Sequence, residues 1–428
     1  MHITILAYGT QGDVRPYVAL GAGLRRAGHT VRLASPRCFQ RLVMQCDLEY
    51  APLAGDPTEL MEMAVARSGS SNPLGAAHAL LQHALPLAAQ MMRDVEAACR
   101  GTDAIVHSLF LTAAGREQAL RLGVPDISAL IFAVFHPTGA FPNPGFPRWP
   151  LGSTYNRLTH VVFNRAFWTG GRLAYAYVRR RAADLPPLEA PWPFGGRAGG
   201  RTPVIYGFSE RVIPRAPEWG QNVHITGYWL LDSPPGWRPS QRLISFLEQG
   251  APPVCVTFGS VIAPDASELT RTVVAALERT QQRAVMVSGW GGLSSVGLPD
   301  STCCIEAAPF DWLFPRVSAI VHHGGAGTTA EAFRAGVPSV IVPFTADQPF
   351  WGWQVHRLGV GPPPIPRRRL TPDGLAEALH TATSDVGMRR RAAELGGQLR
   401  SEDGVARAVE IIERYLADGC ARAIHNRA

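Results

Sequence analysis

The chain has 428 residues, of which 46% are hydrophobic and 18% charged, and its net charge is +7. This length predicts two or three domains, and no uninterrupted apolar run reaches the roughly 18 residues that a membrane-spanning helix needs. All 41 basic residues are arginine, which excludes mechanisms that need a Schiff-base lysine or a P-loop lysine.

The first half of the chain alternates strand-like and helix-like segments. A strand is predicted over 3–7, a turn over 8–12, a helix over 14–27 that Gly28 ends, and a strand over 30–34. The pattern returns as a strand over 104–107, a helix over 112–121 and a strand over 125–133. Such βαβ units predict a parallel sheet. Residues 137–150, which include five prolines, are predicted to form a loop, and helical sequence resumes over 155–183.

The second half follows the same alternation. Strands are predicted over 254–258, 284–288, 303–306, 319–321 and 339–342, with amphipathic segments between them. Two doubly wound domains are therefore expected, over 1–230 and 241–402, joined by a proline-rich linker over 231–240. An amphipathic helix is predicted from 403 to 416, and the segment 403–428 is expected to pack back toward the N-terminal domain.

The most informative motif is Val-His-His-Gly-Gly-Ala-Gly-Thr-Thr over 321–329, between a predicted strand and a helix over 328–335 that Gly336 ends. A Gly-rich turn of this kind points several backbone N–H groups at one spot, and the helix dipole favours an anion there. The glycines alone are equally compatible with a tight turn that binds nothing. The two histidines, the two threonines and Glu331 favour a site for a diphosphate that bears a sugar.

Three segments have sequence motifs that are typical of one protein family, namely Gly9–Pro16, Phe258–Ser260 and the stretch from Asp311 through Trp351. With these segments the chain resembles the GT-B fold glycosyltransferases of family 1. Within that family it is most similar to the group of sterol glucosyltransferases and bacterial natural-product glycosyltransferases. The resemblance implies an α/β fold with two doubly wound, Rossmann-like domains that face a central cleft.

The resemblance also implies which residues bind the donor. The diphosphate is expected at Gly12, Ser260, His323, Gly325, Gly327 and Thr328, the ribose and base at Glu331, Pro309 and Trp290, and the transferred sugar at Asp347 and Gln348. The plant branch places a base-stacking tryptophan where this chain has Ala307. Trp290 is a hypothetical replacement for that aromatic face, and a core or loop role for Trp290 is the alternative.

On the acceptor side, Asp13 follows the first predicted strand at the edge where open α/β sheets bind ligands. In the branch that the chain resembles, this aspartate is the base that takes the acceptor proton. The alternative is that Asp13 caps the helix beginning at Val14, and both roles are compatible. Phe132, His136 and Phe141 are predicted to line an apolar acceptor pocket, although for His136 a structural role is the favoured interpretation.

The resulting expectation is an inverting, metal-independent transfer of a hexose from a UDP- or dTDP-sugar to a hydroxyl of a sterol, polyketide or lipid-like acceptor. No cofactor is expected, because the seven cysteines and the histidines show no metal-ligand spacing. Nucleic acid is not an expected partner, membrane contact is expected to be peripheral at most, and the expected location is the cytoplasm. The alternatives are a GT-B epimerase of nucleotide sugars and a non-catalytic nucleotide-sugar or lipid binding protein.

Overall fold

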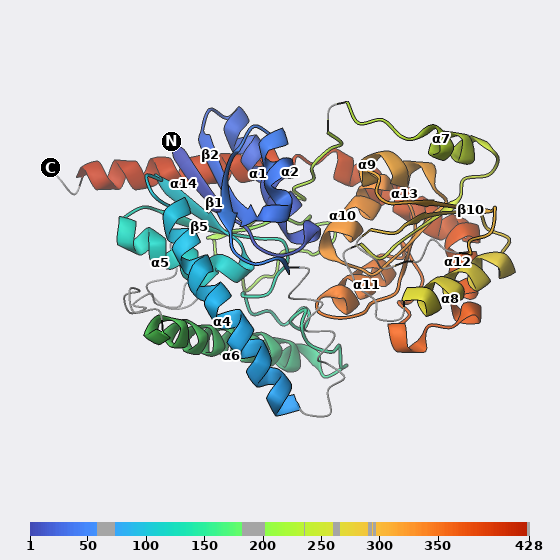
Figure 1. Cartoon of the computed structure of the whole chain (residues 1–428), viewed down its shortest axis with the longest axis horizontal. Coiled ribbons are helices and arrows are strands. Elements are labelled where there is room, and N and C mark those ends of the chain that lie inside the picture. Colours follow the sequence, from blue (N-terminus) through green and yellow to red (C-terminus); the bar gives the residue numbers. More distant parts are fainter. Residues whose placement is uncertain are drawn as a thin grey trace. The chain divides into compact units, whose positions relative to one another are not determined.

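The computed structural model describes residues 1–57, 73–181, 202–234, 236–259, 266–289, 293 and 297–425. The chain divides into two compact units (Figure 1). The first consists of Met1–Leu231 and Asp403–Ala428, and the second of Asp232–Glu402. Within these described ranges, no helix is long and apolar enough to cross a membrane.

A 7-stranded parallel sheet forms the centre of the first unit, in the order β3-β2-β1-β4-β5-β6-β7. The strands are β1 (His2–Leu6), β2 (Thr30–Pro36), β3 (Glu49–Leu53), β4 (Ala104–His107), β5 (Asp126–Leu130), β6 (Val204–Tyr206) and β7 (Val223–Ile225). The chain leaves β1 toward β2 and β3 and later returns to the other side of β1 at β4. The boundary between β1 and β4 is therefore the topological switch point, where open α/β sheets bind ligands.

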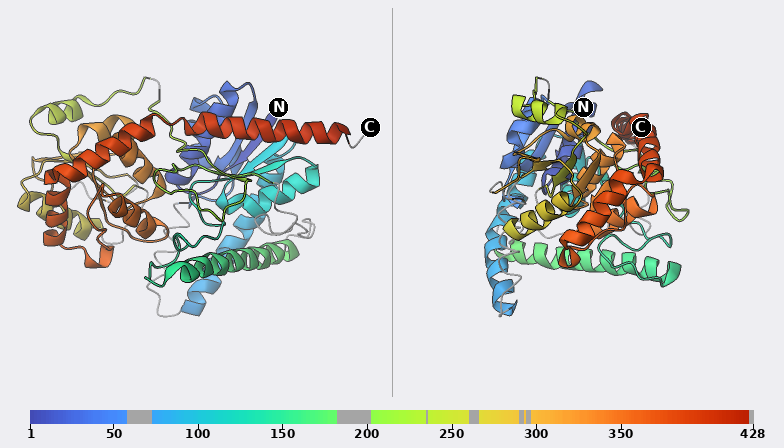
Figure 2. Two further views of the ribbon diagram at one scale, coloured as in Figure 1. Left: turned by 180° about the vertical axis from the view of Figure 1, so that it is seen from behind. Right: turned by 90° about the vertical axis from the view of Figure 1, so that its right-hand side faces the viewer.

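Helices cover this sheet, namely α1 (Gln11–Arg26), α2 (Gln40–Gln45), α4 (Pro73–Ala98), α5 (Thr112–Leu122), α6 (Gly152–Arg181) and α14 (Gly404–His425), with short turns η1 (Arg37–Phe39) and η2 (Leu109–Leu111). The buried residues Leu6, Ala34 and Ile105 of the strands pack against Val95 of α4 and Cys99 just after it. The last helix, α14, packs on α1 and therefore belongs to the same unit as the first strand (Figure 2).

The second unit has a 5-stranded parallel sheet in the order β10-β9-β8-β11-β12. Its strands are β8 (Val254–Thr257), β9 (Ala284–Val287), β10 (Thr302–Ile305), β11 (Ala319–His322) and β12 (Ser339–Ile341). Its helices are α7 (Gln241–Glu248), α8 (Ala266–Arg279), α9 (Phe310–Leu313), α10 (Ala326–Ala335), α11 (Gln348–Arg357), α12 (Pro372–Ser384) and α13 (Val386–Arg400), with turns η3 (Phe314–Arg316) and η4 (Arg367–Arg369). The switch point lies between β8 and β11.

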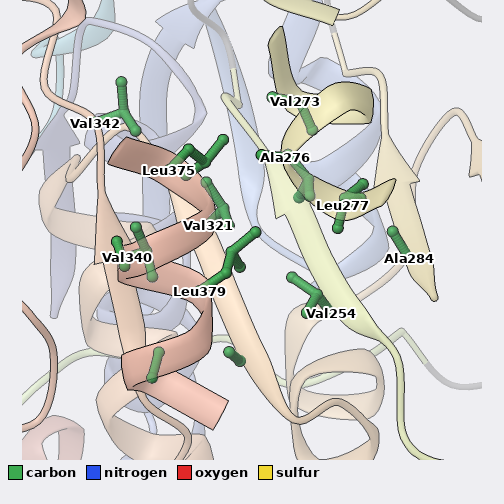
Figure 3. Close-up of a cluster of buried hydrophobic side chains, with 14 of the residues drawn as sticks. Val254, Val273, Ala276, Leu277, Ala284, Val321, Val340, Val342, Leu375 and Leu379 are labelled. Atoms are coloured by element: carbon green, nitrogen blue, oxygen red, sulfur yellow. The ribbon is translucent and has the colours of Figure 1, made fainter. Parts of the chain in front are cut away.

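Both faces of this second sheet are buried, because successive strand residues point to opposite sides. Val254 and Val321 face a core that includes Val273 of α8 and Leu379 of α12 (Figure 3). Their neighbours Cys255 and Ile320 face the opposite core, together with Leu313 of α9 and Ala332 of α10. This two-sided burial explains why the strands read as short continuous apolar runs in the sequence.

The predicted α/β architecture of two doubly wound parallel sheets is confirmed. One local expectation is wrong: the first helix begins at Gln11 and not at Val14, with Thr10 as its N-cap. Gly12 and Asp13 therefore lie inside the first turn of α1. The predicted linker residues from Asp232 onward belong to the second unit.

Candidate active site

The Gly-rich motif lies at the switch point of the second sheet. Because β8 and β11 are adjacent and parallel, the loops that follow them leave the same edge of the sheet. These loops bring Gly259 and His323 into contact, since a Cβ atom built on Gly259 would lie 2.9 Å from Cε1 of His323. The topology thus places the motif where ligands bind in open α/β sheets.

The imidazole of His323 lies against two glycines. One is Gly259, whose φ of +61° favours glycine, and the other is Gly325, where an added Cβ would lie 2.4 Å from Nε2. Burial lowers the pKa of His323 to about 4, so the ring is neutral at pH 7. Its Nδ1 is buried and has no hydrogen-bond partner in the described part of the chain. The side chain is therefore fixed, uncharged and able to donate or accept a hydrogen bond.

The preceding residue, His322, fixes the backbone of the turn. It is fully buried, and its Nδ1 accepts a hydrogen bond from the N–H of Gly324 at 3.2 Å. Gly324 has a φ of +86°, and a Cβ there would lie 2.7 Å from Ile341 and 3.0 Å from the carbonyl oxygen of Gln348. Sequence reasoning gave His322 no role of its own. The signal was present, because a buried polar residue directly before a glycine turn needs a local partner.

Helix α10 starts immediately after this turn. Gly325 is its N-cap in an extended conformation, and within the described part of the chain no cap side chain bonds to the first N–H groups. Gly327 and Thr328 occupy the first turn, both half-buried. Uncapped N–H groups at the positive end of a helix attract an anion. The arrangement can therefore hold a phosphate group beside the neutral ring of His323.

Glu331 lies one turn further along α10 and is ion-paired with Arg334, with 3.0 Å between Oε2 and Nη2. The Glu331 side chain is only 12% exposed. A carboxylate at this position can accept hydrogen bonds from two neighbouring hydroxyls, as the expected ribose contact requires. The ion pair with Arg334 was not predicted, although the spacing of three residues on a helix allows such pairs.

The predicted sugar-binding pair lies at the start of α11, which follows β12. Asp347 accepts a hydrogen bond from Nε1 of Trp351 at 2.8 Å. Gln348 is buried, and its Oε1 accepts hydrogen bonds from the backbone N–H groups of Phe344 at 2.7 Å and Thr345 at 3.1 Å. The side-chain oxygen of Gln348 therefore holds the loop before α11.

Asp13 lies in the first unit, at the switch point beside β1. Its Oδ2 accepts hydrogen bonds from the backbone N–H of Thr10 at 2.8 Å and from the Thr10 hydroxyl at 3.0 Å. Burial raises the pKa of Asp13, while the two bonds from Thr10 act to lower it. Asp13 thus has a structural role at the start of α1, and both hydrogen bonds from Thr10 end on the same oxygen. Gly12, expected at the diphosphate, precedes Asp13 in the first turn of α1.

The predicted acceptor residues differ in their surroundings. His136 contacts the Tyr206 hydroxyl through Nδ1 at 2.8 Å, and burial lowers its pKa to about 4. Phe141 is 5% exposed and packs edge-on against Trp219, as His136 does. Phe132 is half-buried on the segment that follows β5. His136 and Phe141 therefore belong to one packed aromatic cluster.

Three other residues were predicted to bind the donor. Pro309 is half-buried at the N-cap of α9 in the second unit. Ser260 and Trp290 lie outside the described residues. In the part of the chain that the structure describes, no group of three or more His, Cys, Asp or Glu side chains could hold a metal ion.

Comparisons with known proteins identify the family. Residues 3–111 match the model of the glycosyltransferase family 28 N-terminal domain. Residues 265–414 match that of the C-terminal domain of erythromycin biosynthesis protein CIII-like proteins. The chain is 38% identical over 427 residues to the O-mycaminosyltylonolide 6-deoxyallosyltransferase of Streptomyces fradiae, with 97% of both chains covered.

A plant relative and a solved structure agree with this assignment. The chain is 33% identical to a sterol 3-beta-glucosyltransferase of Arabidopsis thaliana, a match that covers 97% of this chain and 68% of the plant protein. The crystal structure of the kitacinnamycin glycotransferase has the same fold, with a TM-score of 0.71 at 21% identity over 97% of this chain and 99% of that one. The chain therefore belongs to the GT-B glycosyltransferases, in the group that contains sterol glucosyltransferases and bacterial natural-product glycosyltransferases.

Proposed function

We propose that this glycosyltransferase transfers a hexose from a UDP- or dTDP-sugar to a hydroxyl of an apolar acceptor, with inversion at the anomeric carbon. The observation that carries the proposal is the His323 ring, which lies against Gly259 and Gly325 at the start of α10, where the N-cap is a glycine without a capping side chain. This geometry supports a site for a diphosphate, because the ring and several N–H groups are fixed before any ligand arrives.

The proposed reaction needs a base for the acceptor and a stabiliser for the leaving group. The acceptor oxygen forms a bond to the anomeric carbon as its proton passes to the Asp13 carboxylate. The bond between the anomeric carbon and the diphosphate oxygen breaks, and the diphosphate takes the electron pair. One preorganised hydrogen-bond donor to a developing anion contributes about 2.7–4 kcal/mol, so several donors at the α10 turn could replace a divalent ion.

Within the donor, the proposal places the ribose hydroxyls at Glu331 and the sugar hydroxyls at Asp347 and Gln348. Since Oε1 of Gln348 already holds the backbone of the loop before α11, its amide nitrogen is the group that we assign to the sugar. Asp347 is half-buried at the N-cap of α11, a position that supports a direct contact with a hydroxyl.

The acceptor class is proposed from the relatives, whose names give O-mycaminosyltylonolide and sterols as the acceptors. Both are large and mostly apolar molecules that carry hydroxyls. The half-buried Phe132 is the predicted pocket residue that we assign to direct acceptor contact. His136 and Phe141 would support the pocket from within their cluster around Trp219.

Donor binding is tested by thermal-shift titration of UDP and dTDP, with and without a chelator, on the wild type and His323→Ala. A ligand at 100 times its Kd stabilises by about 2.7 kcal/mol. We expect one nucleotide to stabilise the wild type without metal, and His323→Ala to lose this response. His380→Ala is the matched control, because His380 is an exposed histidine on α12 of the same unit.

The transfer step is tested with the nucleotide sugar of the base that binds and a panel of macrolide and sterol acceptors. Asp13→Asn should lower kcat by about 10²–10⁴-fold, the usual contribution of a general base, while nucleotide binding stays unchanged. Strict dependence on magnesium or manganese would contradict the proposal. Sugar epimer formation in the absence of an acceptor would favour the epimerase alternative.

A further inference from the structure

Arg334 joins two carboxylates at the end of α10. Its Nη2 lies 3.0 Å from Oε2 of Glu331, and its Nη1 donates a hydrogen bond to Oδ1 of Asp232 at 2.8 Å. The arginine side chain is 19% exposed, whereas that of Asp232 is 81% exposed. One guanidinium therefore connects the carboxylate on the helix with the segment that begins the second unit.

Neighbouring contacts fix both ends of this connection. Ser233 donates from its backbone N–H to Asp311 at 2.9 Å and from its hydroxyl at 2.7 Å. Arg400 donates to the carbonyl oxygen of Arg334 at 2.6 Å. Although burial acts to lower the pKa of Arg334, Glu331 and Asp232 outweigh that effect and raise it. The guanidinium is thus charged and anchored by the surrounding elements.

We propose that Arg334 is a positioning residue for donor recognition, which holds the Glu331 carboxylate in the rotamer that accepts hydrogen bonds from the ribose hydroxyls. This inference rests on the proposed function, in which Glu331 binds the ribose. A glutamate side chain has several rotatable bonds, and ordering it during binding would weaken the affinity for the nucleotide. Arg334 orders it beforehand, because one guanidinium lies within ion-pair distance of both Glu331 and Asp232, whereas the ammonium group of a lysine is a compact charge on a flexible stem.

The proposal predicts a specific change in nucleotide recognition. Ordering a flexible side chain weakens binding by about 2–12-fold, which corresponds to about 0.5–1.5 kcal/mol. We therefore expect Arg334→Gln to raise the Kd of UDP or dTDP, whichever binds, by that factor. The Kd of the analogue that lacks the ribose hydroxyls (2′,3′-dideoxyuridine diphosphate or 3′-deoxythymidine diphosphate) should change little. The preference for the hydroxylated nucleotide should fall accordingly.

A double-mutant cycle separates positioning from general stabilisation. The wild type, Arg334→Gln, Glu331→Gln and the double variant are titrated by calorimetry with each nucleotide and its deoxy analogue. Once Glu331 is replaced, Arg334→Gln should have no further effect on the preference for the hydroxyls. Arg279→Gln is the matched control, since Arg279 pairs with Asp373 on the surface of the same unit, and it should bind both ligands like the wild type.

The possible failures are distinguishable. If Glu331→Gln lowers the preference and Arg334→Gln leaves it unchanged, or weakens both ligands equally, the positioning role is wrong and the proposed function stands. If Glu331→Gln keeps the wild-type preference, the ribose assignment itself is wrong. If Arg334→Gln folds poorly, Arg334→Lys takes its place, because it keeps the positive charge but cannot contact Glu331 and Asp232 with one guanidinium. If the preference of Arg334→Lys for the hydroxylated nucleotide lies between those of the wild type and Glu331→Gln, the proposal is supported. If Arg334→Lys has the wild-type preference, the proposal is overturned.

Discussion

The close approach of Gly325 to His323 yields the sharpest prediction. In Gly325→Ala the new methyl group would lie 2.4 Å from Nε2 and 3.1 Å from Cδ2 of the imidazole. The φ of Gly325 is −65°, which alanine adopts without strain. Any loss of stability in Gly325→Ala would therefore come from the contact of the methyl group with the ring. Gly259 also lies close to the ring, since a Cβ built on it would be 2.9 Å from Cε1, so the space into which the ring could move is restricted.

Two magnitudes follow from this geometry. Forcing extra volume into a packed site costs about 1–3 kcal/mol of folding stability. If the ring leaves its place instead, the nucleotide loses a hydrogen bond to a charged group, worth about 1.5–3 kcal/mol. Since about 1.4 kcal/mol corresponds to a factor of ten, the Kd of UDP or dTDP should rise by about 10–150-fold.

The assay is calorimetric titration of the nucleotide together with urea denaturation of the free protein. Gly397→Ala is the matched control, because an added Cβ on that exposed residue of α13 meets only Arg400, at 3.9 Å. This control should gain up to about 1 kcal/mol in stability, since alanine is the better helix former, and should bind the nucleotide normally. Wild-type affinity and stability in Gly325→Ala would refute the reasoning.

Three further predictions concern single hydrogen bonds and pH. Thr10→Val removes a bond that lowers the pKa of Asp13, so the acid limb of kcat/KM should move to higher pH. Gln348→Leu leaves the N–H groups of Phe344 and Thr345 without their acceptor, which should cost about 1–3 kcal/mol for each group in urea denaturation, whereas Gln348→Glu should cost less. In the folded protein the pKa of His323 is about 4, below the ordinary histidine value of 6.5. The unfolded chain therefore binds a proton at this side chain more readily than the folded protein does. Stability should therefore fall as the pH drops from about 6.5 toward 4, by at most about 1.4 kcal/mol per pH unit for this histidine, and His323→Gln should flatten the decline.

The strands that carry the site were predictable from the sequence. The strand at Ala104–His107 has the predicted bounds, and those at Val254–Thr257 and Ala319–His322 differ from prediction by one residue. These strands are buried on both faces, so each is a short apolar run bounded by loop residues. The helix of the motif ends at Gly336, whose φ of +73° is the left-handed cap that the sequence suggested.

Other elements had no comparable signal. The edge strand Glu49–Leu53 contains Pro52 and alternates exposed with buried residues, so it lacks a continuous apolar run. Strands β6 and β7, with three residues each, were not predicted, although β12, which was predicted, is no longer. The start of α1 was misplaced because Gly12 resembles turn sequence, although Thr10 and Asp13 have the spacing of a capping box.

The partners of the site residues were the least predictable part. The contacts of Gln348 with the loop before it, and of Arg334 with Asp232, depend on where the chain returns in three dimensions. A residue pattern tells which side chains are polar, but it does not tell which of several nearby groups each one meets. Site chemistry read from a motif therefore identifies candidate residues better than it identifies their hydrogen bonds.

The packing of α14 on α1 has a consequence for the order of folding. Gly23 of α1 faces Val405 of α14 so closely that a Cβ atom would lie 2.3 Å from its Cγ1. These two residues are separated by most of the chain, including all of the second unit. Domains fold largely as units while the polypeptide leaves the ribosome. The second unit is therefore synthesised in full before the first can acquire its last helix, so the first unit cannot complete its native packing until nearly the whole chain has been made.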